Sequence, residues 1–113
     1  MLIFKKFALK DRTRDANRVL QKYPNRIPII VSSNTFKLDK YKYLVPLDIT
    51  VGQFCYILRK QIHLGPEIAV FLLFNGRIPN SNTLMSNIYN QEKDKDGYLY
   101  CGMIPENTFG NNK

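Results

Sequence analysis

The fold is decided in the middle of the chain, by the stretch TVGQFCYILRKQIHLGP (residues 50–66). Thr50 followed three residues later by Gln53 is a capping box, in which each side chain bonds the other residue's backbone N–H at the start of a helix. Ile57 falls about 60° off the apolar stripe of this helix, which places it at the margin or on the surface. Gly65-Pro66 is expected to end the helix. The stripe itself, spaced for a helix with one buried face, is Val51, Phe54, Cys55, Leu58 and Ile62.

Two strands are predicted before this helix. Residues 27–31 are apolar and β-branched, and Pro28 fits a strand only where no ladder donor is needed. Residues 41–47 form the second strand, with apolar side chains on both faces, so that neither face is simply a solvent face.

Two further strands and a short helix are predicted after it. Residues 68–74 are seven consecutive apolar residues, which indicates a central strand buried on both faces. Asn75-Gly76 closes it as a hairpin turn, with residues 77–79 as a brief edge return. Leu84 to Tyr89 form a short helix, and after the charged loop 91–96 the alternating residues 98–103 form the last strand.

A helix precedes all of these elements. Leu9, Thr13, Ala16 and Leu20 recur at helical spacing, and the run stops before Tyr23-Pro24. Residues 2–8 are expected to form a short turn. The order of elements predicts an α+β protein with the β-grasp arrangement of ubiquitin, preceded by a helical extension. The expected parts are an extension packed on the core (1–23), the β-grasp core (24–105) and a flexible tail (106–113).

The formal charge of +8 is unevenly distributed. Residues 1–42 contain eleven Lys or Arg against three Asp, whereas residues 43–113 contain six basic and six acidic residues. A basic region of this kind is either a solvated surface or a site for an acidic partner: nucleic acid, an anionic membrane or a protein with acidic flanks. No aromatic-interleaved basic motif of a known nucleic-acid-binding fold is present, which disfavours nucleic acid.

Composition also limits the class of protein. No run approaches the roughly 18 apolar residues of a membrane span, and Lys5-Lys6 interrupts the first apolar residues too early for a signal peptide, so a cytosolic protein is expected. Cys55 and Cys101 lie in apolar segments, which favours buried reduced thiols. With one histidine, His63, they give no zinc-ligand spacing. No nucleophile has an oriented base, so neither an enzyme nor a cofactor is expected.

The tail contains Phe109-Gly110 followed by Asn111-Asn112-Lys113. Glycine lets another protein's active site close around the backbone, which makes Gly110 a candidate for cleavage and conjugation. A fraying polar terminus has the same composition, so the tail alone does not decide between the two.

Several segments at matching separations resemble the autophagy-related ubiquitin-like modifiers, the family of the GABA-receptor-associated protein and the microtubule-associated protein light chains. The resemblance runs in register from about Leu9 to Gly110. The segments are KYPNRIPIIV (22–31), KYLVP (42–46), TVGQF (50–54), RK (59–60), IHL (62–64), DGYLY (96–100) and the tail.

The resemblance implies a monomeric, non-enzymatic tag. Family members are cut after the glycine by a dedicated cysteine protease, passed through ubiquitin-like activating and conjugating enzymes, and joined to phosphatidylethanolamine on autophagosomes. Carried over, Gly110 is the conjugated residue and Phe109 the apolar anchor for the protease. The protein is then expected in the cytoplasm and, after lipidation, on autophagosomes and related vesicles.

The resemblance also implies binding of cargo receptors and adaptors, through short motifs with an aromatic residue and, three positions on, an aliphatic one. Such motifs add a strand along residues 42–46 and fill two pockets. The first pocket is formed by Asp15, Val19, Pro28, Ile30, Lys42, Leu44 and Tyr98. The second is formed by Tyr43, Val45, Pro46, Ile49, Phe54, Ile57 and Leu58. The acidic flank of a motif is expected to meet Lys22, Arg26, Lys40, Lys42 and Arg59.

The sequence departs from the family at three places. Met103-Ile104-Pro105 replaces the usual aromatic and small polar residues before the tail, so protease recognition is expected to differ in detail. Gln61 stands where a basic residue is common, which softens selection for acidic motifs. Residues 1–10 either dock on the domain or touch anionic lipid.

Two alternative functions stay open for the protein. One is an unconjugated peptide-binding scaffold, and the other is a small basic nucleic-acid-binding domain, for which steeply salt-dependent binding is expected.

Overall fold

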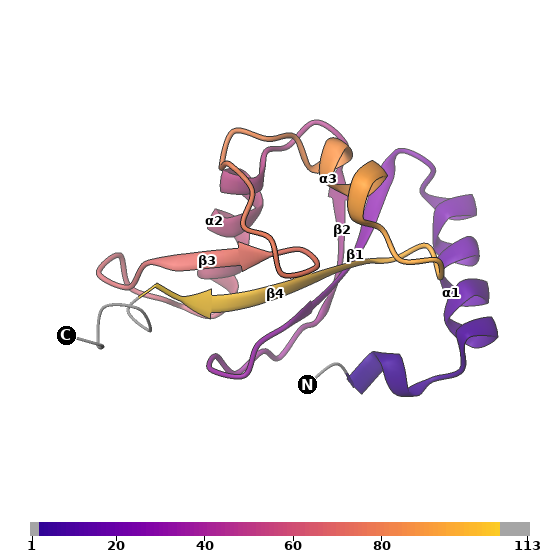
Figure 1. The fold of residues 1–113 in the computed structure, drawn as a ribbon, viewed down its shortest axis with the longest axis horizontal. Helices are drawn as coiled ribbons and strands as arrows, with labels where there is room; N and C mark the ends of the chain where they lie inside the picture. The colour runs from indigo at the N-terminus through magenta and orange to yellow at the C-terminus, as the bar shows by residue number, and fades with distance from the viewer. Residues whose placement is uncertain (1–2, 107–113) are drawn as a thin grey trace.

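The structure is a computed structural model that describes residues 3–106. A four-stranded sheet with the strand order β2-β1-β4-β3 forms its centre (Figure 1). The two inner strands, β1 and β4, are parallel, and the edge strands β2 and β3 are each antiparallel to their neighbour. The predicted α+β class is therefore confirmed. The elements are η1 (Ile3–Lys6), α1 (Leu9–Lys22), β1 (Arg26–Ser32), β2 (Lys42–Pro46), α2 (Val51–Gln61), β3 (Val70–Leu73), α3 (Met85–Glu92) and β4 (Leu99–Pro105).

The capping box that defines α2 is present as predicted. The N–H of Gln53 donates to Thr50 Oγ1 at 3.1 Å, and the N–H of Thr50 donates to Gln53 Oε1 at 2.8 Å. These bonds satisfy donors that a helix start leaves unpaired. The predicted stripe faces the sheet with Phe54 and Leu58 at its centre, each at most 1% exposed.

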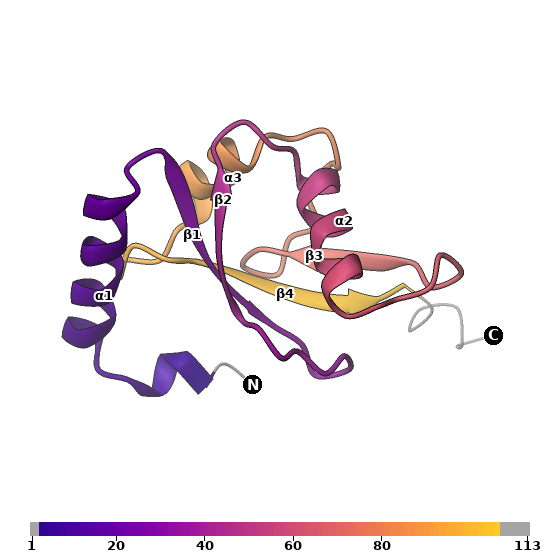
Figure 2. The ribbon, with the colours of Figure 1, turned by 180° about the vertical axis from the view of Figure 1, so that it is seen from behind.

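Helices cover both faces of the sheet (Figures 1 and 2). On one face, α2 and α3 enclose the main core with residues such as Ile29, Leu99 and Met103. On the other face, η1 and α1 pack Phe4 and Ala16 against Ile30 and Tyr98 in a smaller cluster. Since successive residues of a strand point to opposite faces, Ile29 and Leu99 serve the main core while Ile30 and Tyr98 serve the smaller cluster.

The seven-residue apolar run is not a central strand, and that prediction is wrong. β3 covers only Val70–Leu73, pairs with β4 alone and is half-buried apart from Leu72. The central positions belong to β1 and β4, where Pro28 lies one residue before the stretch that pairs with β4. Its missing donor therefore costs no hydrogen bond to that strand. An unbroken apolar run indicates burial without stating where in the sheet the strand lies.

The turn after β3 agrees with its sequence. Asn75 and Gly76 both have positive φ, 53° and 78°, as a type I′ turn requires. Phe74 and Arg77 exchange backbone hydrogen bonds of 2.8 and 3.1 Å across it. The return after the turn amounts to this single bridge rather than a strand.

Helix α1 ends where Tyr23-Pro24 predicted, and its predicted stripe is buried only in part. Arg12 and Ala16 are its buried residues, whereas Leu9 is 40% exposed. The face toward the sheet is therefore centred on Ala16 and on Arg12, whose ion pair is described below, while Thr13 and Leu20 are half-buried. No helix within the described residues has the length and apolar character needed to cross a membrane.

Candidate functional site

The outer edge of β2 is open to an added strand. β2 is the first strand of the sheet and, among residues 3–106, pairs only with β1, in the register Ile29 opposite Tyr43. Alternate residues of an edge strand direct their N–H and C=O groups away from the sheet, where another extended chain can bond them. Tyr43 and Val45 face the main core, while Lys42, Leu44 and Pro46 lie on the opposite, more exposed face.

A hollow of about 330 Å³ lies beside β2, and most of the predicted first-pocket residues line it. Ile30, which lies in the buried cluster on this face, is not part of the lining. Lys40 and Tyr43, which the sequence assigned to other roles, belong to the wall. The lining of this β2 hollow is Val19, Pro28, Lys40, Lys42, Tyr43, Leu44 and Tyr98.

Asp15, the remaining first-pocket residue, holds two of the lining side chains. It accepts a hydrogen bond from Tyr98 Oη at 2.5 Å and one from Lys42 Nζ at 3.1 Å, and it pairs with Arg18. Partial burial favours a raised pKa for Asp15, but these donors outweigh it and the pKa is lowered. Burial and the bond to Asp15 raise the pKa of Tyr98. At neutral pH, Asp15 is thus an anion that fixes Tyr98 and Lys42.

The predicted second pocket divides into a floor and a rim. The floor is part of the main core, since Tyr43, Val45, Phe54 and Leu58 are at most 6% exposed. Tyr43 and Phe54 meet edge to face with ring centroids 5.9 Å apart. The residues that solvent reaches are Pro46, Ile49 and Ile57, and Ile57 is 37% exposed, as its position off the stripe predicts.

The predicted acidic-flank contacts do not form one group. Lys22, Arg26 and Lys40 are exposed, and the Lys40 ammonium lies 4.6 Å from the centroid of the Tyr43 ring. Arg59 has a different environment. Its guanidinium donates to the carbonyls of Gly65, at 2.6 Å, and Ile68, at 2.5 Å.

Arg59 therefore fastens the end of α2 to the loop before β3. It lines a separate hollow of about 490 Å³ together with residues of β3. Both terminal nitrogens of this half-buried arginine already donate to carbonyls, an environment that Lys22, Arg26 and Lys40 do not share. Sequence reasoning missed this role because residues 65–68 carry no side-chain signal for it.

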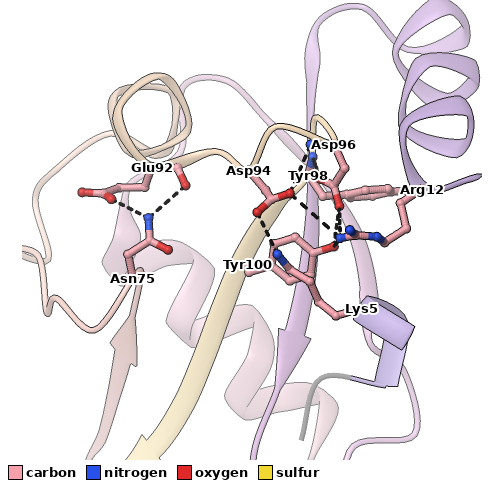
Figure 3. Close-up of polar contacts among 8 residues, drawn as sticks. All are labelled: Lys5, Arg12, Asn75, Glu92, Asp94, Asp96, Tyr98 and Tyr100. Carbon is pink, nitrogen blue, oxygen red and sulfur yellow. Dashed lines mark hydrogen bonds and ion pairs between the residues drawn. The ribbon is translucent and has the colours of Figure 1, made fainter. Parts of the chain in front are cut away.

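A polar network on the α1 side was also missed (Figure 3). Arg12 Nη1 donates to Asp96 Oδ2 at 3.0 Å, and Tyr100 Oη donates to the same oxygen at 2.6 Å. Lys5 reaches from η1 to Asp94 at 2.7 Å. The side chain of Asp96 is fully buried, and that of Arg12 is 10% exposed. The only sequence signal was that Arg12 lies one turn before the buried Ala16.

Both cysteines are free thiols, but only Cys101 is buried as predicted, whereas Cys55 is half-buried. Burial raises the pKa of Cys101 and, to a smaller extent, that of Cys55, so neither is activated as a nucleophile. Within residues 3–106, no group of three or more His, Cys, Asp or Glu side chains could hold a metal ion.

The predicted conjugation residues Phe109 and Gly110 lie outside the described residues. The departure Met103-Ile104-Pro105 is the last part of β4, where Pro105 lies opposite Val70. The N–H of Glu106 donates to the carbonyl of Ala69 at 2.8 Å. Glu106, the last described residue, is thus still attached to the sheet.

Comparisons with known proteins agree with this architecture. The model of the family "Autophagy protein Atg8 ubiquitin like" matches residues 11–110. Autophagy-related protein 8B of Oryza sativa subsp. indica is 49% identical over 106 residues, covering 90% of this chain and 89% of that protein.

Solved structures give the same result. Trypanosoma brucei ATG8 superposes with a TM-score of 0.83 at 39% identity, covering 88% of this chain and 90% of the other. Plasmodium falciparum Atg8, in complex with a Plasmodium falciparum Atg3 peptide, superposes with a TM-score of 0.78 at 32% identity, covering 88% and 92%. The predicted ubiquitin-like fold is confirmed, and the chain belongs to the Atg8 family of autophagy-related ubiquitin-like proteins.

Proposed function

We propose that this ubiquitin-like protein of autophagy binds short peptide motifs along β2 and is joined through Gly110 to phosphatidylethanolamine. The Atg8 family consists of modifiers rather than enzymes. The observation that carries the peptide-binding part is the unpaired edge of β2, with the β2 hollow directly beside it. An aromatic side chain of the motif enters this hollow, and the aliphatic side chain three positions on rests against Pro46, Ile49 and Ile57.

The two anchors supply most of the binding energy. Burying one apolar side chain is worth roughly 1.5 to 3 kcal/mol, whereas one exposed charge pair is worth about 0.2 to 1 kcal/mol. Main-chain bonds along β2 set the direction of the peptide, and the basic residues around the hollow affect partner choice and association rate. The second site opens further only if the tightly packed Phe54 and Leu58 shift.

Partners follow from the same surfaces. The Atg3 peptide of the Plasmodium structure supports a conjugating enzyme as one partner. The others are an activating enzyme, a processing cysteine protease that cuts after Gly110, and cargo receptors and adaptors with short linear motifs. The protein acts as a monomer in the cytoplasm and, once lipidated, on autophagosomal membranes.

The nucleic-acid alternative has less support because five of the eleven basic side chains in residues 1–42 are engaged in ion pairs within the protein. Lys5, Arg12, Arg14, Arg18 and Lys42 each form an ion pair with an aspartate. The charge of a phosphate-binding surface has to be free to displace counterions.

Peptide binding is tested by fluorescence anisotropy with a labelled peptide that has an aromatic-x-x-aliphatic motif and an acidic flank. We expect Leu44→Ala to weaken binding about ten-fold, because a contact of the anchor in the hollow is lost. Leu84→Ala is the matched control, since Leu84 is a leucine 39% exposed that does not line the hollow, and this variant is expected to have no effect. Equal losses in the two variants would contradict binding at β2.

Conjugation is tested separately by intact mass after expression with the processing protease or in cells of the source. The wild type is expected to lose Asn111-Asn112-Lys113 and gain a phospholipid, and Gly110→Ala to do neither. A wild type that binds the peptide but keeps its full mass is the unconjugated scaffold.

A further inference from the structure

The N-terminal turn η1 packs against the wall of the β2 hollow through one aromatic side chain. Phe4 is 6% exposed, and its ring meets Tyr98 edge to face at a centroid distance of 5.2 Å and Tyr41 at 6.4 Å. Lys5 fixes the turn at its other end, with its ammonium 2.7 Å from Asp94 and 4.6 Å from the ring centroid of Tyr100 (Figure 3). The turn is therefore attached to the segment before and at the start of β4, which also supplies Tyr98 to the hollow.

Lys42 is engaged by this turn. Its ammonium lies 4.8 Å from the centroid of the Phe4 ring and 3.1 Å from Asp15 Oδ2. Its side chain is 43% exposed and also lines the β2 hollow. An aromatic face and a carboxylate thus compete with any acidic group of a bound peptide for the same cation.

Lys40, on the same hollow, differs from Lys42. Its ammonium lies over Tyr43, and among residues 3–106 no acidic side chain pairs with it. The hollow therefore has one cation that an acidic flank can engage directly and one that is already bound within the protein.

We propose that Phe4 is a specificity-determining residue of the β2 hollow, because its ring holds the Lys42 ammonium and so limits how strongly the site prefers motifs with acidic flanks. This inference rests on the proposed peptide binding. Phe4 is not itself a lining residue but lies behind two of them, Lys42 and Tyr98, so we expect its effect to fall on the flank charge of the ligand through Lys42 rather than on the motif anchors.

The test uses two peptides with the same motif, one with three flanking Asp residues and one with three flanking Ser residues. The measured quantity is the ratio of their Kd values, determined by fluorescence anisotropy at low salt. Phe4→Leu keeps an apolar side chain against Tyr98 but removes the aromatic ring. We expect it to raise the preference for the acidic peptide about two- to five-fold, the range of a partly exposed cation–π contact, with the Ser peptide unchanged.

Two variants establish that the effect passes through Lys42. In a Lys42→Gln background, Phe4→Leu is expected to leave the ratio unchanged. Phe7→Leu is the matched control: Phe7 is 56% exposed, touches Phe4 edge to face, and has no ammonium over its ring among the described residues. It is expected to leave the ratio at the wild-type value.

Three results would overturn the inference: an unchanged ratio in Phe4→Leu, equal changes for both peptides, or the same rise without Lys42. Equal changes are the result that a purely supporting role of Phe4 produces. Thermal unfolding of each variant shows whether the fold is kept. If the wild type bound neither peptide, the proposed peptide binding would itself be refuted and this inference with it, whereas wild-type binding without a shift in the ratio refutes the inference alone.

Discussion

The two faces of the sheet are stabilised in different ways. The face covered by α2 and α3 is closed by a large apolar core centred on Phe54, Leu58 and Leu99. The face covered by η1 and α1 has a buried cluster of Phe4, Ala16, Ile30 and Tyr98, and it adds the Arg12–Asp96 pair. The apolar core of the first face stabilises the fold through burial, which is not directional. On the second face, the ion pair between Arg12 and Asp96 also fixes the position of α1. The β2 hollow opens on the second face, where Val19, Lys42 and Tyr98 meet.

The largest expected loss of stability is at Phe54. Phe54 is fully buried on the α2 side, so Phe54→Ala is expected to lower the free energy of unfolding by about 4 kcal/mol, through lost burial and the cavity left behind. Urea unfolding at pH 7 measures this. Tyr56→Ala, on the same helix at 62% exposure, is expected to change stability by less than about 0.5 kcal/mol. Similar losses in both would show that α2 is not packed as described.

The buried ion pair on the α1 side is tested at Arg12. Arg12→Met leaves the buried carboxylate of Asp96 without its cation, which is expected to cost about 3 kcal/mol in urea unfolding. Adding Asp96→Asn removes the buried charge and is expected to recover part of the loss. Arg14→Met, at an arginine 69% exposed, is the control and is expected to have almost no effect. An exposed ion pair contributes less than about 1 kcal/mol to the free energy of unfolding. If Arg12→Met cost no more than this, the α1 side would not depend on a buried ion pair, and the two faces would not differ in this respect.

The smallest expected effect is the pH dependence of the stability that Asp15 contributes on the α1 side. Hydrogen bonds from Tyr98 and Lys42 outweigh burial and hold the pKa of Asp15 below the ordinary carboxyl value of 3.8. A carboxyl with a lowered folded pKa stabilises the fold above its unfolded pKa, and this contribution is lost as the pH falls through the folded value. The stability difference between wild type and Asp15→Asn is therefore expected to be full at pH 7 and to shrink toward pH 3.

Urea unfolding at pH 7, 5 and 3 measures this difference. Asp11→Asn is the control because the carboxyl of Asp11 is 49% exposed and pairs only with Arg14 among the described residues. A difference for Asp15→Asn that is the same at pH 3 as at pH 7 would mean that the charge of Asp15 is not what stabilises the α1 side.

The main-core side of the fold could be predicted from sequence because its signals are local. The capping box of Thr50 and Gln53 and the turn at Asn75-Gly76 each depend on a few neighbouring residues. The place of β3 at the sheet edge could not be predicted, because it depends on β4 pairing with β1, far away in sequence. A run of apolar residues does not indicate which strands will lie beside it in the sheet.

The same distinction applies to the candidate site. Five predicted first-pocket residues line one hollow, because the family resemblance placed residues from α1, β1, β2 and the segment just before β4 in correspondence. The roles of Arg12, Arg59 and Phe4 were not predicted. Each depends on a partner distant in the chain or on backbone carbonyls, and charge or aromatic character alone does not identify that partner.

The parallel pairing of β1 with β4 has a consequence for how the protein is made. Ile29 lies opposite Leu99, so the centre of the sheet joins an early strand to the last one. During synthesis the β1–β2 hairpin emerges long before β4, and the inner edge of β1 has no partner until then. Contacts this distant in sequence slow folding. A nascent chain halted before β4 exposes two strand edges at once, and such intermediates are prone to aggregate and depend on chaperones.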